Sequence, residues 1–221
     1  MKYHSVFDII GPVMIGPSSS HTAGAARIGK AARSIFGRLP KKAVITFYGS
    51  FANTHKGHGT DVAIVGGILN FDTYDNRIID SLVIAKDLGI DVQFVLSEQE
   101  KEHPNTAKIY LEDEQGTIEV VGVSIGGGKI NITEINGFKI NISGNSPSLL
   151  VFHEDRFGVI ASVSNVLGLS EINIGYMEVA RKQKGSIALM VIETDQLITR
   201  EVIAKIKELP SVKSIAILKT S

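Results

Sequence analysis

The sequence predicts an α+β (α/β) chain in which a mixed α/β region precedes a βαββαβ unit of the ferredoxin-like kind. Two observations support this fold class. Before Thr106, apolar residues recur at helical spacing between short apolar runs, and from Thr106 onward a two-residue alternation replaces that pattern. After a later polar break, the patterns of strands and helices follow one another in the order β-α-β-β-α-β.

Three helices are predicted in the N-terminal region. The first covers residues 23–36, which are rich in alanine and follow a loop of small hydroxyl residues. Ser20 or Thr22 is therefore the expected N-cap, because a hydroxyl oxygen there can accept from an unpaired amide of the first turn. Residues 61–69 are predicted as a second helix, and residues 78–86, with apolar side chains at helical spacing, as a third.

Strands are predicted around these helices. Residues 43–48 and 91–96 are short apolar runs with the length of buried strands. The alternating region predicts four more strands, at residues 107–112, 117–124, 129–134 and 138–143. Asn136 and Gly137 form a strong hairpin-turn signal between the last two. Residues 49–59 are rich in glycine and are predicted to form a loop.

A polar break over residues 144–148 is the best domain boundary, which gives predicted domains of residues 1–144 and 145–221. The second domain shows four strand patterns, at residues 149–153, 172–181, 186–193 and 212–218, and two helix patterns, at residues 158–169 and 200–209. This order predicts one layer of helices packed on an antiparallel sheet.

The composition excludes several classes of protein. The 23 lysine and arginine residues balance 23 aspartate and glutamate residues, so the charge favours neither nucleic acid nor a membrane surface as partner. The chain has no cysteine, and therefore no disulfide, no catalytic thiol and no thiolate ligand for a metal. No stretch approaches the roughly 18 apolar residues of a spanning helix, and residues 1–8 lack a secretory signal. We expect a cytoplasmic protein.

Two loops of the N-terminal region contain most of its reactive side chains. Their polar members are Ser18, Ser19, Ser20, His21 and Thr22 in the first loop, and His58, Thr60 and Asp61 in the second. Each loop precedes a predicted helix, whose unpaired amides suit a small carboxylate. Each loop also brings a histidine, which suits proton transfer near neutral pH. Ordinary N-caps and a glycine turn around His58 would explain the same residues without a function.

The C-terminal unit resembles an ACT domain, an amino-acid-sensing module. Its turn at residues 153–158 is similar to the corresponding turn of serine-regulated phosphoglycerate dehydrogenases, and residues 171–174 match the start of their second strand. The resemblance implies an effector pocket at a domain–domain interface, lined by His153, Asp155 and Asn173.

Two residues of this turn depart from that pattern. The phosphoglycerate dehydrogenases have asparagine where this chain has Asp155, and proline where it has Phe157. Asp155 is also a good N-cap for the helix that follows, and His153 is also explained as a hydrogen-bonded residue at the end of a strand. Many modules of this kind only pair subunits, so an effector site and a purely structural role both stay open.

Four motifs resemble the beta chain of the iron–sulfur L-serine dehydratases. They are Gly-Pro-Ser-Ser-Ser-His-Thr at residues 16–22, Gly-His-Gly-Thr-Asp at 57–61, His-Pro-Asn-Thr at 103–106 and Ser-Ile-Gly-Gly-Gly at 124–128. They occur in the order and at the spacing of that family. Together with the ACT-like unit, the resemblance spans nearly the full chain. His55 lies outside the family pattern.

The resemblance implies a beta subunit of a heteromeric L-serine ammonia-lyase, which forms pyruvate and ammonia from L-serine. A [4Fe-4S] cluster would be held by the cysteines of an alpha subunit, and self-association is expected through the ACT domain. His21 and His58 are predicted catalytic residues that face the alpha subunit and handle protons or substrate. The predicted substrate-binding residues are Ser18, Ser19, Ser20, Thr22, Thr60 and Asp61.

A different class of function also fits these patterns, namely a non-catalytic amino-acid-binding protein that regulates another enzyme. The N-terminal region resembles the intervening allosteric domain of some phosphoglycerate dehydrogenases, which binds anions, and would then be a second effector site. A cysteine-rich partner chain would favour the enzyme subunit. Tight binding of serine by the chain alone would favour the regulator.

Overall fold

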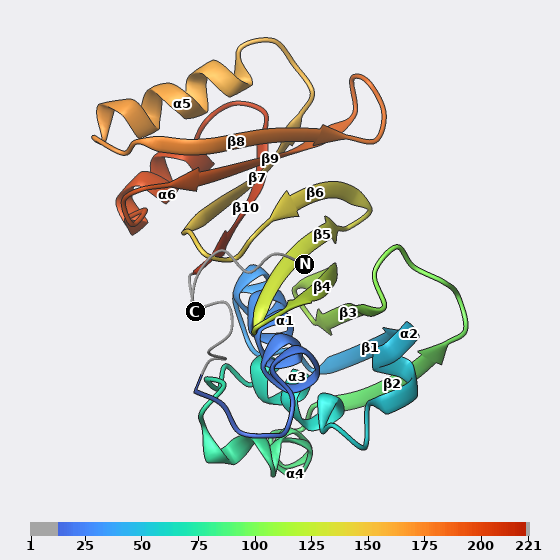
Figure 1. Ribbon diagram of the computed structural model, residues 1–221. Coiled ribbons are helices and arrows are strands. Elements are labelled where there is room, and N and C mark those ends of the chain that lie inside the picture. The colour runs from blue at the N-terminus through green and yellow to red at the C-terminus, as the bar shows by residue number, and fades with distance from the viewer. Residues whose placement is uncertain (1–12, 220–221) are drawn as a thin grey trace. The chain divides into compact units, whose positions relative to one another are not determined.

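The computed structural model describes residues 13–219 and divides the chain into two compact units, with the division between Asn136 and Gly137 (Figure 1). Each unit contains its own helices and most of one β-sheet, which confirms the predicted α+β class. Residues 1–12, which include the segment searched for a secretory signal, lie outside the described residues.

The first sheet has the strand order β2-β1-β3-β4-β5-β6. Its bounds are β1 (Lys42–Tyr48), β2 (Asp91–Ser97), β3 (Asn105–Asp113), β4 (Gly116–Gly126), β5 (Lys129–Ile135) and β6 (Phe138–Ile142). β1 and β2 pair in parallel, whereas β3 runs antiparallel to both β1 and β4. Asn136 and Gly137 both adopt positive φ, at 48° and 77°, as the predicted hairpin turn between β5 and β6 requires.

The helices of the first unit are α1 (Gly24–Phe36), α2 (Gly49–Thr54), α3 (Thr60–Ile68) and α4 (Ser81–Asp87), with a π-helical turn η2 (Ser19–Ala23) and a 3₁₀ turn η3 (Asn76–Ile78). α1 packs on β3, β4 and β5, and also against α3. The two helices approach closely at two glycines. A Cβ on Gly67 would lie 2.0 Å from the Ala26 oxygen, and one on Gly29 would lie 2.1 Å from the Ile64 oxygen.

Two local predictions were wrong. Helix α2 forms inside the run predicted as a loop, because six residues are too few for a helical period to show in the sequence. Neither Ser20 nor Thr22 caps the first helix. Instead the π-helical turn extends the helix backward, and Ser18 is its N-cap, with the Ser18 Oγ accepting from the backbone N–H of His21 at 3.1 Å.

The second unit contains an antiparallel sheet of order β10-β7-β9-β8 with two helices. Its bounds are β7 (Ser148–Glu154), α5 (Val159–Leu169), β8 (Ile174–Arg181), β9 (Ile187–Thr194), α6 (Arg200–Lys207) and β10 (Val212–Leu218). The core joins helix residues such as Val163 and Ile206 to strand residues such as Val151 and Met190. This is the predicted βαββαβ order.

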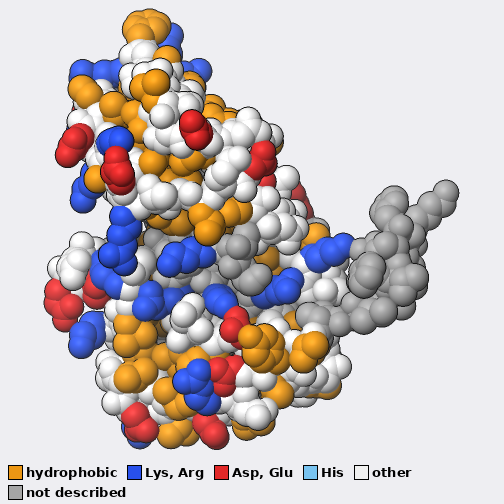
Figure 2. Space-filling view, turned by 90° about the vertical axis from the view of Figure 1, so that its left-hand side faces the viewer, with side chains coloured by type: hydrophobic (Ala, Val, Ile, Leu, Met, Phe, Trp, Pro, Cys, Tyr) orange, Lys and Arg blue, Asp and Glu red, His pale blue; other side chains and the backbone are white. Residues whose placement is uncertain are grey.

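No helix in residues 13–219 is long and apolar enough to cross a membrane. Acidic and basic side chains both occur on the face drawn in Figure 2, as the overall balance of 23 positive and 23 negative residues leads one to expect.

An ion pair between Arg38 and Asp113 stabilises the turn between β3 and β4. The Asp113 carboxylate receives two hydrogen bonds from the Arg38 guanidinium, one of them 2.6 Å long at Nη2. It also accepts from the backbone N–H groups of Gln115 and Gly116, at 2.9 and 3.1 Å. The Arg38 guanidinium, helped by these amides, lowers the pKa of Asp113 to about 2.

We expect the Asp113 ion pair to make stability depend on acidity. The folded-state pKa of Asp113 lies below that of an unfolded aspartate, about 3.9, so its contribution is present above that value and is lost as the pH falls toward 2. Asp113→Asn should therefore lower the melting temperature at pH 7 more than at pH 2.5, measured by circular dichroism. Glu114→Gln, an exposed neighbour, is the control. An equal effect of Asp113→Asn at both pH values would contradict the expectation.

Candidate functional site

The two loops predicted to hold the reactive residues meet around η2. The Thr22 hydroxyl donates to the backbone oxygen of His58 at 2.9 Å, which ties the first loop to the second. The rings of His21 and His58 stand edge to face, with their centroids 4.7 Å apart. The fold therefore brings together two histidines that are 37 residues apart in the sequence, as a site built from both loops requires.

Serine hydroxyls contact both ring nitrogens of His21. Nδ1 lies 3.1 Å from the Ser20 Oγ and 3.4 Å from the Ser18 Oγ. Nε2 lies 2.8 Å from the Ser50 Oγ, on α2. Burial lowers the pKa of His21 below its usual value, and the neighbouring His58 lowers it further. The imidazole of His21 is therefore neutral at pH 7, and serine hydroxyls contact it at both ring nitrogens.

His58 is held in a different way. Its backbone N–H donates to the Thr54 oxygen at 3.0 Å, and its backbone oxygen accepts from Thr22. The ring nitrogen Nδ1 is buried and has no hydrogen-bond partner among residues 13–219. A buried polar atom without a partner is uncommon in folded proteins and often marks a functional position. His58, unlike His21, keeps a ring nitrogen available.

The other residues predicted in these loops have separate surroundings. Thr60 begins α3 and is fully buried, and its hydroxyl has no partner within the described part of the chain. The Asp61 carboxylate accepts from the backbone N–H of Val62 at 2.9 Å, a contact within the first turn of α3. Ser19 begins η2, where its backbone oxygen accepts from the N–H of Gly24.

The π-helical turn η2 lies directly against the fourth sequence motif. A Cβ on Gly24, the residue after η2, would lie 2.0 Å from the Ser124 Oγ, so only glycine fits there. Ser124 on β4 is fully buried, and its hydroxyl has no partner in the described residues. Turns of π-helix are rare and occur frequently at functional sites.

We expect Ser124→Ala to leave the stability unchanged or slightly higher. The substitution removes a buried hydroxyl that forms no hydrogen bond, so the variant no longer has to desolvate that group without compensation. Urea unfolding of the wild type and the variant measures the difference. A loss of more than about 1 kcal/mol, the usual net worth of one hydrogen bond, would show that the hydroxyl has a partner.

Ser50 and Asn105 were not among the predicted site residues. Ser50 follows β1 at the start of α2 and contacts His21. Asn105 belongs to the third motif and forms an isolated bridge with Gly49, and its Oδ1 is buried without a partner in residues 13–219. A glycine and a serine directly after a buried strand are the signal that points to a tight turn carrying a polar side chain.

Residues 13–219 contain no group of three His, Asp or Glu side chains that could hold a metal ion. The chain has no cysteine either. Iron–sulfur clusters are held mainly by cysteine thiolates, and the sequence offers none.

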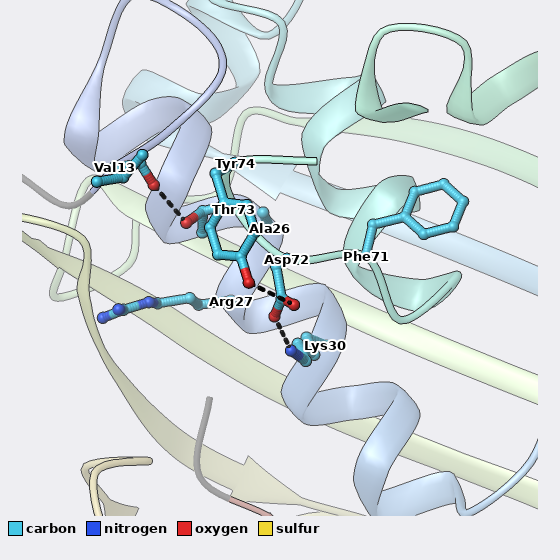
Figure 3. Close-up of a pocket in the computed structure, with 8 residues that line it drawn as sticks. All are labelled: Val13, Ala26, Arg27, Lys30, Phe71, Asp72, Thr73 and Tyr74. Carbon is cyan, nitrogen blue, oxygen red and sulfur yellow. Dashed lines mark hydrogen bonds and ion pairs between the residues drawn. The ribbon is translucent and has the colours of Figure 1, made fainter. Parts of the chain in front are cut away.

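A separate cavity of about 260 Å³ lies beside α1, lined by Val13, Ala26, Arg27, Lys30, Phe71, Asp72, Thr73 and Tyr74. Figure 3 shows that Lys30 and Tyr74 both reach Asp72, whereas Arg27 extends away from that ion pair. Arg27 instead donates to the backbone oxygen of Gly128 at 2.9 Å. None of the predicted site residues lines this cavity.

In the second unit, His153 and Asp155 lie at the end of β7. His153 is buried and its Nδ1 donates to the Glu154 oxygen at 2.7 Å, while its Nε2 has no partner among the described residues. The Asp155 carboxylate accepts from the Gly185 N–H at 2.9 Å and from Arg181 at 3.2 Å. Asp155 therefore fastens the turn between β8 and β9 and does not cap α5.

Asn173 lies at the other end of the same sheet. The strand pairs Glu154–Ile187 and Ile174–Thr194 place the end of β7 and the start of β8 at opposite ends of β9. A strand of this length extends for about 20 Å or more, and the Asn173 side chain already donates to Asp195 at 2.6 Å. Within one chain the three predicted effector residues are therefore not brought together.

Known protein families match both parts of the chain. The model of the serine dehydratase beta chain family matches residues 5–134, and that of the ACT domain matches residues 148–211. The chain is 60% identical over 212 residues to a probable L-serine dehydratase beta chain of Bacillus subtilis, with 96% of each chain covered. It is 40% identical to the L-serine dehydratase beta chain of Peptoniphilus asaccharolyticus, with 90% of each covered.

A more distant similarity joins part of the chain to a larger enzyme. The D-3-phosphoglycerate dehydrogenase of Methanocaldococcus jannaschii is 32% identical over 142 residues, which are 64% of this chain and 27% of that enzyme.

The fold and the site define an α+β protein in which a unit with a histidine–hydroxyl cluster precedes a ferredoxin-like module. The chain belongs to the serine dehydratase beta chain family and carries a C-terminal ACT domain. This confirms the resemblance drawn from the four motifs. The two relatives named as L-serine dehydratase beta chains also confirm the prediction of a lyase subunit.

Proposed function

We propose that this chain is the beta subunit of a heteromeric iron–sulfur L-serine dehydratase. With a cluster-bearing alpha subunit, it would convert L-serine to pyruvate and ammonia in the cytoplasm. The observation that carries the proposal is the pairing of His21 and His58, with ring centroids 4.7 Å apart and serine hydroxyls around them.

The reaction requires a base that removes the α-proton of L-serine and a proton for the β-hydroxyl, which leaves as water. The enamine that remains is hydrolysed by water to pyruvate and ammonia. We assign proton acceptance to His58, because its Nδ1 has no partner among the described residues. Both ring nitrogens of His21 are occupied by serine hydroxyls, so His21 orients the neighbouring ring and bounds the site. A [4Fe-4S] cluster of the alpha subunit would supply a Lewis acid for the leaving hydroxyl.

The hydroxyl residues around η2 would hold the other end of the substrate. Ser18, Ser20 and Thr22 are half-buried or buried beside His21, and their hydroxyls already contact His21 or the His58 backbone, so they would line the substrate pocket. Thr60 has a buried hydroxyl without a partner in residues 13–219, which would donate to the carboxylate of a small amino acid. Fixed positioning supplies much of the acceleration of such reactions. Ser19 and Asp61 complete the proposed substrate-binding set, although their observed contacts are local.

The second unit would serve assembly and regulation. We propose residues 145–221 as the ACT domain, which associates with a second copy. Because Asn173 lies at the opposite end of the sheet from His153 and Asp155, an effector pocket containing all three needs two copies of the unit.

Pyruvate formation from L-serine tests the proposal directly. The chain would be assayed anaerobically with iron and reductant, alone and together with the cysteine-rich alpha chain. Activity only in the mixture is the expected result. No activity in a mixture whose alpha chain carries an intact cluster would overturn the proposal. Tight binding of serine by the chain alone would then favour the amino-acid-binding regulator.

A further inference from the structure

We propose that Ser50 is a positioning residue that fixes the ring of His21. The third sequence motif, at residues 103–106, holds the backbone of Ser50 in place. The inference rests on the proposed function in one respect, since it assumes that the His21–His58 pair lies at the reacting site. It adds a residue that no sequence motif indicated.

The Ser50 side chain contacts His21 and does not cap its own helix. Its Oγ lies 2.8 Å from the His21 Nε2, the shortest side-chain contact that this ring makes. The N-cap of α2 is Tyr48, with no side-chain hydrogen bond to the helix. Ser50 is the second residue of α2 and does not occupy the N-cap position, so its hydroxyl is not needed for capping and is available to His21.

The backbone around Ser50 is tightly constrained. Gly49 has a φ of 53°, and a Cβ there would lie 2.7 Å from the Pro104 oxygen, so the close approach requires glycine. That same Pro104 oxygen accepts from the Ser50 N–H at 2.8 Å. From inside α2, the Thr54 hydroxyl donates to the Ser50 oxygen at 2.7 Å. These contacts leave Ser50 little freedom to move away from His21.

The third motif forms the turn that supplies the Pro104 oxygen. The His103 Nδ1 accepts from the backbone N–H of Asn105 at 3.1 Å, and the Thr106 hydroxyl donates to the His103 oxygen at 2.5 Å. The side chains of His103 and Thr106 therefore stabilise the turn around Pro104. The Pro104 oxygen of this turn accepts from the Ser50 N–H and so fixes the Ser50 backbone. This gives the motif a physical role that its sequence alone did not reveal.

The contacts of His21 also indicate which of its nitrogens carries the proton. The Ser18 Oγ already accepts from the backbone N–H of His21, so its own proton is free to point toward Nδ1 or toward Ser20. We take Nδ1 as the acceptor from these serine hydroxyls, which makes Nε2–H the donor to the Ser50 Oγ. We propose that Ser50 holds His21 as the Nε2-protonated tautomer.

The ¹⁵N chemical shifts of the His21 ring in the full-length chain test this without the alpha subunit. The wild type should show a single Nε2-protonated form, and Ser50→Ala should give a mixture of tautomers or a broadened ring signal. Ser50→Thr, which keeps the hydroxyl, should restore the wild-type shifts. The matched control is Asn53→Ala, which removes an exposed polar side chain from the same helix without touching Ser50 or His21. Unchanged His21 shifts in a folded Ser50→Ala chain would overturn the inference.

Kinetics of the complex provide the second readout. Ser50→Ala should lower kcat for pyruvate formation by up to about 10²-fold, the cost of a small misplacement of a catalytic group, with little change in KM. Asn53→Ala should keep both constants. Equal kcat values for Ser50→Ala and Asn53→Ala would also overturn the inference. A wild-type mixture without activity would instead count against the proposed function, because the ring shifts of His21 do not depend on turnover.

Discussion

Replacing His58 by asparagine should lower kcat for pyruvate formation in the reconstituted complex by about 10²–10⁴-fold, the usual contribution of a general acid–base residue. Both ring nitrogens of His21 have serine partners, whereas the Nδ1 of His58 has no hydrogen-bond partner among the described residues. His58 is therefore the histidine available to accept a proton. Asparagine has a similar size but does not accept a proton near neutral pH. Initial rates at several serine concentrations would separate kcat from KM.

A second histidine in the same loop provides the control. His55 lies outside the family motif, is half-buried, and its Nδ1 contacts the backbone oxygen of Ala52 at 3.0 Å. His55→Asn should therefore keep kcat within about twofold, well inside the 10² lower bound for loss of a general base. Full activity of a folded His58→Asn complex would remove His58 from the proposed role of base. Circular dichroism of both variants would confirm that the fold is intact.

Placing alanine at Gly67 should destabilise the first unit by about 1–3 kcal/mol or more, the range for overpacking a tight interface. A Cβ on Gly67 would meet the Ala26 oxygen at 2.0 Å and the Lys30 nitrogen at 2.7 Å. Both are backbone atoms of α1, so relief requires the two helices to separate. That separation would also disturb the site, since η2 continues into α1 and the second loop leads into α3.

Gly168 provides a matched control for the Gly67 variant. It also lies inside a helix, α5, but a Cβ there would meet nothing within 4 Å. Gly168→Ala should therefore stabilise by about 0.5–1 kcal/mol through helix propensity alone. Urea unfolding followed by circular dichroism measures both variants, with a separate transition fitted for each unit if they unfold independently. Equal stability of Gly67→Ala and the wild type would show that α1 and α3 are not in close contact.

Local patterns in the sequence were sufficient to predict most of the elements. The alanine content indicated α1, the 3.6-residue period indicated α4, and the two-residue alternation indicated β3 to β6. The turn at Asn136 and Gly137 was predictable because asparagine and glycine tolerate the positive φ values that both residues adopt. Helix α2 was not predictable, because its six residues carry no complete period.

The chemistry-bearing residues were partly predictable. His21 and His58 stood out because histidine and small hydroxyls precede two helices. Their different surroundings were not predictable: which ring nitrogens find partners depends on Ser50, which lies 29 residues from His21 in the sequence and reaches it only in the fold. The sequence likewise suggested three effector residues without showing that the strand pairing separates Asn173 from Asp155.

The sequence by itself determined the fold class, the two-part organisation and the family of this protein, because each depends on local periods and contiguous motifs. Only the tertiary structure decided that the first, second and fourth motifs meet at one π-helical turn, that Ser50 contacts His21 and that His58 keeps an unpaired nitrogen in the described residues. The physical reason is that hydrogen-bond partners and burial are set by segments distant in the chain, and packing of α1 against α3 and β4 fixes which of them meet.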